Sequence, residues 1–289
     1  MDQFQQFLDE RKYLKNVSDK TLVYYECAFR SWTRYSQGDW KAWIMYLQRS
    51  GVSAISINTY ICAMNAYWKW AGVDLKVAYL KEEEKILATL SPDQVKRLLS
   101  FKPKGRNQMR AHIAAMLILD GGYRISEALE LRFEHIDFEN LVVRVRGKGN
   151  KHRLVPLSSD MRKVLYRYAT QHSGPGKLLF GTCRDTPVTV RNFNRDMKTM
   201  GSKLGISGVR FSPHTLRHTF AVSYLRAGGN LFYLSRILGH TSVTTTQRYL
   251  QSVGVDDLQA VHDRLSPMSP QSGMKGAMGY PDRPSFWAR

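Results

Sequence analysis

Hydrophobic residues recur at three- and four-residue spacing over much of the chain, which is the period of an amphipathic helix. Between residues 56 and 71 this series consists of Ile57, Ile61, Met64, Tyr67 and Trp68. Ser18-Asp19 and Ser56 stand where helices begin, and Gly51 and Gly72 stand where a left-handed residue ends them. The first eighty residues therefore predict four helices, at residues 2–13, 18–35, 39–49 and 56–71.

The pattern changes at residues 73–90, VDLKVAYLKEEEKILATL, where the charged run KEEEK is typical of a solvated linker. Ser91 is then followed by proline at the first position of a predicted helix, a common way for a helix to begin. The chain is thus expected to divide into a helical domain at residues 1–75, a linker at 76–90 and a second domain that starts near residue 91.

The second domain mixes two periods. Helical patterns cover residues 108–119, 125–132, 189–204, 213–227 and 231–238, with glycines at or near their ends. Between them, two β-rich runs, residues 141–146 and 151–157, flank the turn sequence GKGN, which predicts a hairpin with Lys148 at its tip. The expected fold class is mainly α with a small β-sheet (α+β).

The net charge of the chain indicates which kind of molecule it binds. The 289-residue chain has a formal net charge of +19 and 43% hydrophobic residues, so it can build a core and favours a polyanion such as DNA. The longest wholly apolar run, residues 113–119, is too short to span a bilayer, and the N-terminus, MDQFQQFLDE, lacks the features of a signal peptide. Cys27, Cys62 and Cys183 have no metal-ligand spacing. We expect no membrane association and a cytoplasmic, nucleoid-associated location.

Three short motifs contain residues that could bind a phosphate. His214 and Arg217 lie three residues apart at the start of a predicted helix, where free N–H groups favour an anion. Arg124 follows two glycines and could pair with Glu127, and Lys148 sits between glycines in the hairpin turn. Each motif alone is equally or better explained as a helix cap, an intrahelical ion pair or a solvated turn.

Together these residues describe one kind of chemistry. Arginines, a lysine and histidines without a carboxylate cluster can stabilise a phosphoryl transition state through cations of the protein itself, so no metal and no cofactor are expected. Tyrosine is a known covalent nucleophile. From spacing alone, however, Tyr249 would be a core aromatic at the end of LGHTSVTTTQRYL, a segment whose threonines are weak helix formers.

The order of four blocks, GGYRISEAL, GKGNKHRLVPL, SPHTLRHTFA and LGHTSVTTTQRYL, resembles the tyrosine recombinases of the phage-integrase and Xer family over roughly residues 90–265. The resemblance is weaker over residues 1–75, which correspond to the family's helical core-binding (SAM-like) DNA-binding domain. It implies that residues 91–265 form the catalytic domain. The catalytic residues that it implies are Arg124, Lys148, His214, Arg217, His240 and the nucleophile Tyr249.

The resemblance also implies a mechanism. Tyr249 would attack a DNA phosphate and form a 3′-phosphotyrosyl link, and the strands would be exchanged through a Holliday junction. The partners would be double-stranded DNA and three further copies of the chain, with residues 255–265 docking onto a neighbour in a homo-tetramer; the alternative is that this helix packs on its own domain. Residues 266–289 are rich in Pro, Gly, Ser and Met, which predicts a disordered tail.

Two other functions remain open at this point. A type IB topoisomerase shares the same active-site chemistry, although the chain is short for that class. Residues 214–240 also contain two predicted helices joined through Gly228-Gly229, as in a helix-turn-helix regulator that binds DNA without cleaving it.

Overall fold

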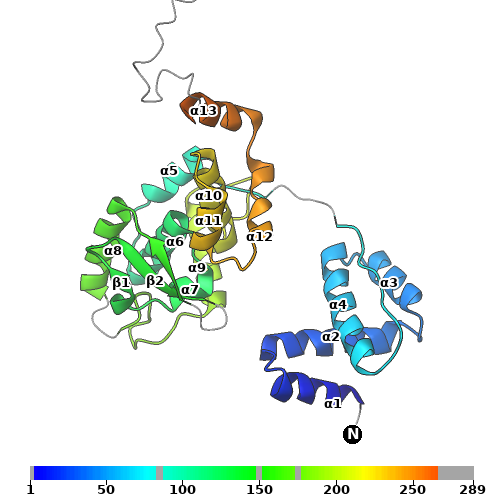
Figure 1. Cartoon of the computed structure of the whole chain (residues 1–289). Helices are drawn as coiled ribbons and strands as arrows, with labels where there is room; N and C mark the ends of the chain where they lie inside the picture. Colours follow the sequence, from blue (N-terminus) through cyan, green and yellow to red (C-terminus); the bar gives the residue numbers. More distant parts are fainter. Residues whose placement is uncertain (1–2, 83–86, 148–151, 173–176, 266–289) are drawn as a thin grey trace, which may run out of the picture. The chain divides into compact units, whose positions relative to one another are not determined.

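The computed structural model describes residues 3–82, 87–147, 152–172 and 177–265 (Figure 1). Lys148 and the expected tail, residues 266–289, lie outside the described residues. The chain forms two compact units, Met1–Lys85 and Ile86–Arg289, which are described separately below. Most of the described residues are helical and one small sheet is present, so the predicted fold class is confirmed.

The N-terminal unit is helical throughout its regular elements. These are α1 (Gln3–Asp9), a π-helical turn (Glu10–Leu14), α2 (Asp19–Tyr35), α3 (Trp40–Arg49) and α4 (Ala54–Trp70). The side chains of Ser18, Asp39 and Ser53 accept hydrogen bonds from backbone N–H groups of the first turns of α2, α3 and α4. Because Ser53 is the cap of α4, that helix begins earlier than predicted from Ser56.

Aromatic side chains fill the core of this unit. Trp43 is fully buried, and the ring of Trp32 meets those of Trp43 and Trp68 edge-on, at centroid distances of 5.5 and 5.0 Å. Edge-to-face pairs of this kind add about 0.5–1.5 kcal/mol beyond the area that they bury. The dense aromatics of the first eighty residues therefore build a core.

The segment after α4 runs back along that helix. Asn65 exchanges two hydrogen bonds of 2.9 Å with the backbone of Val77, and Asn58 does the same with Leu80 at 2.9 and 2.8 Å. Val77 is buried. Since Asn58 and Asn65 lie two turns apart on one face of α4, they hold residues 77–80 in an extended path on the N-terminal unit.

The C-terminal unit is built around α6 (Arg106–Gly121), which is buried along most of its length. Helices α8 (Ser159–His172), α9 (Val190–Lys203) and α10 (Pro213–Arg226) pack against it. The remaining elements are α5 (Pro92–Leu99), α7 (Ile125–Leu129), a 3-10 turn (Phe133–His135), α11 (Leu231–Leu238), α12 (Thr244–Gln247), a 3-10 turn (Leu250–Ser252) and α13 (Val255–Leu265) (Figure 1).

One antiparallel sheet, β1 (Ile136–Asp137), β2 (Val142–Arg146) and β3 (His152–Pro156), completes this unit. The predicted hairpin is formed by β2 and β3, with Arg146 opposite His152. Val143, Val145 and Val155 face the core. The exposed face of the same strands contains Arg144, Arg146 and His152. Along the described part of the chain, no helix combines the length and apolar character needed to span a membrane.

Candidate active site

Two glycine turns bring distant parts of the C-terminal unit together. Gly122 ends α6 with φ +65°, and a Cβ there would lie 2.5 Å from Phe220 and 2.6 Å from Leu238. Gly239 ends α11 with the same φ, and a Cβ there would lie 2.8 Å from the side chain of Arg153. Only glycine adopts this backbone conformation while leaving room for such neighbours. The residues that follow, Arg124 and His240, are thereby brought into one site.

Arg217 ties the two turns to each other. It is 5% exposed, on the second turn of α10, and donates hydrogen bonds to the carbonyl of Gly122 and, at 2.9 Å, to that of Leu238. Burial lowers the pKa of its guanidinium to about 10, and the charge of Arg124 adds to this effect, while the phenol of Tyr249 opposes it. Arg217 is therefore still a cation at neutral pH, and the Tyr249 hydroxyl lies within its electrostatic reach.

Glu127 holds two arginines in place. Its carboxylate accepts hydrogen bonds at 2.8 Å from the Nη1 atom and from the backbone N–H of Arg124, and a bidentate pair at 2.8 and 2.7 Å from Arg153. Burial alone would raise the pKa of Glu127, but the hydrogen bonds from Arg153 and Arg124 lower it overall. Arg124 also reaches the carbonyl of Gly239, at 3.2 Å.

Arg153 is the second residue of β3 and contacts Glu127 from the strand that follows the GKGN sequence. Its side chain is 12% exposed, because it projects from the core face of β3 onto Glu127. Its Nε donates at 2.8 Å to the carbonyl of Ile237, at the end of α11. Arg153 therefore connects β3 with the turns that position Arg124 and His240.

His240 is uncharged in this arrangement. Arg217 Nη2 donates to His240 Nε2 at 2.9 Å, and a guanidinium has no lone pair to accept, so Nε2 must be the unprotonated nitrogen. Nδ1 then carries the hydrogen and donates it to Thr246 Oγ1 at 2.8 Å. Burial, followed by the charges of Arg217 and Arg124, lowers the pKa of His240 to about 4.

Tyr249 lies two residues after α12, which is a single turn of four residues. The side chain is 2% exposed and packs with apolar residues of α10 and α11. Its ring is nearly parallel to that of His240, with centroids 6.4 Å apart, and its other neighbour is His218, at 5.6 Å. Tyr249 is thus both a core aromatic and a neighbour of the arginine cluster, so the two interpretations of its position are compatible.

His214 and His218 lie one turn apart on α10. His214 is exposed, and its ring centroid is 6.5 Å from that of His218. His218 is half-buried, and among the described residues its buried Nδ1 has no hydrogen-bond partner. A buried polar atom without a hydrogen bond costs about 1–3 kcal/mol of stability, and folded proteins usually avoid this cost. The Nδ1 of His218, unpartnered within the described part of the chain, is therefore unusual.

The structure therefore brings together Arg124, Arg217, His240 and Tyr249, and places His214 next to His218, whose ring in turn meets that of Tyr249. The sixth expected residue, Lys148, is outside the described residues. Two further residues of the site, Arg153 and His218, were not predicted from the sequence. The i, i+4 spacing of His218 from His214 was the available signal for the second of these.

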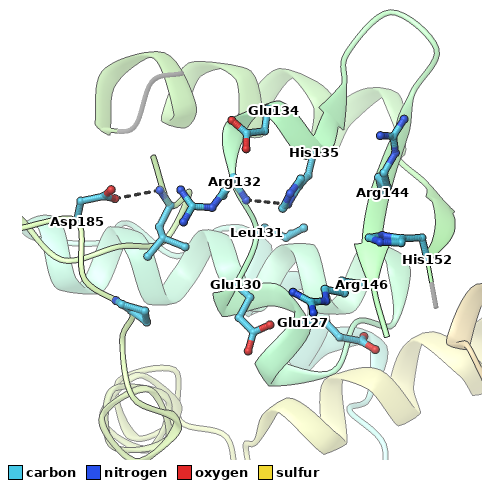
Figure 2. A pocket seen from close by; sticks show the side chains of 12 residues that line it. Glu127, Glu130, Leu131, Arg132, Glu134, His135, Arg144, Arg146, His152 and Asp185 are labelled. Carbon is cyan, nitrogen blue, oxygen red and sulfur yellow. Dashed lines mark hydrogen bonds between the residues drawn. The ribbon is translucent and has the colours of Figure 1, made fainter. Parts of the chain in front are cut away.

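A cavity of about 710 Å³ lies between Glu127 and the exposed face of β2 (Figure 2). Glu127 forms part of its wall, so the carboxylate that holds the two arginines also borders this space. The other charged lining residues are Arg132, Arg144, Arg146, Glu130, Glu134 and Asp185, and the rings of His135 and His152 also line the cavity. Arg144 and Arg146 are exposed on β2 next to the hairpin turn, which makes them available to backbone phosphates.

No group of three or more His, Cys, Asp or Glu side chains with the arrangement of a metal site occurs in the described ranges. The cations of this site are guanidinium groups. Arginine stays charged and presents a planar set of donors that matches phosphate oxygens. The site can therefore bind and polarise a phosphodiester.

Acidification should destabilise the protein through two of these histidines. His218 and His240 both have a pKa lowered to about 4, with burial as the main cause, against 6.5 in an unfolded chain. Between these pH values the unfolded chain binds more protons than the folded one. The contribution of the two histidines to the free energy of unfolding is therefore fully present above pH 6.5 and is lost as the pH drops toward 4. Urea unfolding at a series of pH values should show this slope. His240→Gln should make it shallower, and an unchanged slope in that variant would contradict the assignment.

Comparison with known proteins gives a consistent result. The family model described as "Phage integrase family" matches residues 88–253. Tyrosine recombinase XerC of Syntrophus aciditrophicus (strain SB) is 31% identical over 246 residues, which are 78% of this chain and 79% of the relative. Tyrosine recombinase XerA of Thermococcus kodakarensis (strain ATCC BAA-918 / JCM 12380 / KOD1) is 29% identical over 276 residues, which are 91% of this chain and 94% of the relative.

A solved structure shares the fold. The integrase of the transposon Tn1549, in complex with a circular intermediate DNA, superposes with a TM-score of 0.72 at 22% identity. The match covers 92% of this chain and all of the other. With the family model spanning residues 88–253 and a relative more than 30% identical over most of both chains, the chain belongs to the phage integrase family of tyrosine recombinases.

Proposed function

We propose that this protein is a site-specific DNA recombinase that cleaves and rejoins DNA strands through a covalent bond to Tyr249. One observation carries the proposal: Tyr249 lies against a cluster in which Arg124, Arg217 and His240 converge from three separate parts of the chain. A buried tyrosine needs none of these groups for packing. A tyrosine that attacks a phosphodiester needs cations for the oxygens of the transition state.

The chemistry assigned to the site is a transesterification. Tyr249 Oη attacks phosphorus, the bond from phosphorus to the 5′-oxygen breaks, and a 3′-phosphotyrosyl link remains. Arg124 and Arg217 bind the non-bridging oxygens, where they stabilise the added negative charge. The link conserves the energy of the phosphodiester bond, so attack by the 5′-hydroxyl of a partner strand reseals the DNA. Two such rounds exchange both strands through a Holliday junction.

Proton transfer is assigned to three further residues. Lys148, which lies between β2 and β3 in the sequence, protonates the leaving 5′-oxygen, and His214 assists at the tyrosine. His240 hydrogen-bonds to a non-bridging oxygen. Because its Nε2 accepts a bond from Arg217, this contact requires His240 to gain a proton or change tautomer when the phosphate binds.

We assign residues 1–75 as a core-binding DNA domain, 76–90 as the connection and 91–265 as the catalytic domain. Double-stranded DNA is the partner, and the basic side chains of β2 contribute phosphate contacts.

The assembly is a homo-tetramer on two DNA sites, with residues 255–265 docking onto a neighbour. The supporting observation is that Leu258 of α13 is 59% exposed, although Asp257 at the start of this helix forms an ion pair of 3.1 Å with Arg226 of α10.

Covalent capture tests the proposal. Nicked duplexes with a randomised centre are incubated with the protein, and a nick close to the cleavage position lets the short 5′-hydroxyl strand diffuse away, which traps the adduct. We expect a protein–DNA band on a denaturing gel, and sequencing of the captured DNA then gives the target site. Tyr249→Phe, which lacks only the hydroxyl, should form none.

The same experiment separates the alternatives. A helix-turn-helix regulator would bind the duplexes without any adduct. A type IB topoisomerase would form the adduct and relax supercoiled DNA, but would not exchange strands between two copies of the captured site. An adduct formed by Tyr249→Phe would contradict the assignment of the nucleophile.

A further inference from the structure

His218 lies beside the nucleophile and has no role in the chemistry assigned above. Its ring contacts that of Tyr249, with centroids 5.6 Å apart and planes tilted by 53°. Its Nδ1 is shielded from solvent and has no hydrogen-bond partner among the described residues. Of the two histidines of α10, His218 is the one in ring contact with Tyr249, whereas His214 is in contact with His218.

The groups around His218 keep its ring uncharged. Burial is the main cause that lowers its pKa to about 4, followed by the charges of Arg248, His214 and Arg217. His214 and Arg217 belong to α10, and Arg248 and Tyr249 belong to the segment packed against it; no carboxylate faces the ring among these groups. An uncharged imidazole has a nitrogen lone pair that can accept a proton.

We propose that His218 is a further catalytic residue that accepts the proton of the Tyr249 hydroxyl during DNA cleavage and returns it during rejoining. This inference rests on the proposed function. In the forward step the Oη–H bond breaks, Oη bonds to phosphorus, and the proton goes to a ring nitrogen of His218. The electron pair of the breaking bond leaves with the 5′-oxygen, which takes its own proton from Lys148.

Electrostatics favours this transfer only when DNA is bound. The charges of Arg217 and Arg248 oppose protonation of His218, so the ring is uncharged and one of its nitrogens keeps a lone pair that can accept a proton. A bound phosphate brings negative charge to the same cations and makes a protonated ring less costly. His214, exposed and one turn away on α10, continues the path from His218 to solvent, which accounts for its assisting role.

The decisive variant is His218→Phe, which keeps an aromatic ring against Tyr249 but has no nitrogen. We expect its rate of adduct formation on the captured DNA site to fall on the order of 100-fold, the usual size of a general-base effect. His218→Gln provides a polar second variant in case the phenylalanine disturbs folding. The matched control is His172→Phe on α8, where a histidine also stacks on a tyrosine, at 4.8 Å from Tyr168, and which should behave like the unchanged protein.

The pH dependence distinguishes proton transfer from packing. Without His218 the proton of the Tyr249 hydroxyl must go to solvent, so the rate of His218→Phe should rise with pH between pH 6 and 9, as the hydroxide concentration rises. The unchanged protein should be nearly independent of pH over this range. A residue that only packs against Tyr249 would change the rate by the same factor at every pH.

A sulfur substitution separates the two proton transfers. When sulfur replaces the 5′-bridging oxygen of the captured site, the leaving group needs no proton. Cleavage by Lys148→Ala should then recover, whereas cleavage by His218→Phe should not, because its defect lies at the nucleophile. If the sulfur substrate restored cleavage by His218→Phe, or if His218→Phe cleaved the ordinary substrate as fast as the unchanged protein, the role of His218 would be wrong while the proposed function would stand. Failure of the unchanged protein to form any adduct would overturn the proposed function and this inference with it.

Discussion

Replacing Arg217 with alanine is expected to lower the rate of covalent adduct formation by about 10²–10³-fold, while the affinity for duplex DNA stays within a few-fold. Loss of one transition-state donor costs about 2.7–4 kcal/mol. Affinity for a long duplex comes from many phosphate contacts, of which one is removed. Because Arg217 also holds the carbonyl groups of Gly122 and Leu238, the upper end of this range is expected. Single-turnover cleavage and a gel-shift titration measure the two quantities.

Two variants make this result interpretable. Arg217→Lys keeps the positive charge but loses the planar set of donors, so it should recover only part of the rate. Arg97→Ala is the control for structural loss. Arg97 donates to the helix-end carbonyls of Leu204 and Gly205 at 2.9 and 3.0 Å, a similar arrangement outside the site. Equal losses of binding and cleavage in Arg217→Ala would contradict a catalytic role.

Much of the helical framework could be predicted from the sequence because its signals are local. The side chains of Ser18, Ser212 and Asn230 cap helices as their residue types indicate, and β2 and β3 form on the two sides of the GKGN sequence. Helix α8 escaped prediction although its buried residues, Met161, Leu165, Tyr168 and Ala169, follow the helical period. Its start signal is also present in the sequence, because Ser158 caps the helix by accepting a hydrogen bond of 3.2 Å from the backbone N–H of Met161, and Asp160 lies in the first turn.

The contacts between motifs could not be predicted in the same way. Nothing in the local sequence indicates that Arg153 is buried, and only the register of β2 and β3 shows that it shares the core face with Val155 and Val145. Similarly, residues at the i, i+3 spacing of Arg124 and Glu127 often form an ordinary ion pair on a helix surface, so this spacing does not predict a buried site. The function of Glu127 comes from a third residue, 26 positions away, that no local pattern connects to it.

The second large effect is expected at Glu127, and it concerns stability as well as catalysis. Glu127→Ala would leave the largely buried guanidinium of Arg153 without its counter-charge, and removing one partner of a buried ion pair costs about 3–5 kcal/mol. The side chains of Arg153 and Glu127 are only 12% and 5% exposed, so solvent cannot replace the lost bonds. We expect a lower urea midpoint, and a fall in cleavage because Arg124 loses the carboxylate that orients it.

Glu127→Gln distinguishes the two consequences. The amide keeps the size of the side chain and one oxygen acceptor, so more of the stability should be retained, but the charge that balances Arg124 and Arg153 is lost. Asp160→Ala is the matched control, because Asp160 and Lys163 form an ion pair at 3.3 Å that is 95% and 72% exposed and should contribute at most about 0.5 kcal/mol. If Glu127→Ala kept both its urea midpoint and its cleavage rate, the arginines would be positioned by the backbone carbonyls of Gly239 and Ile237 alone, and the carboxylate would have no organising role.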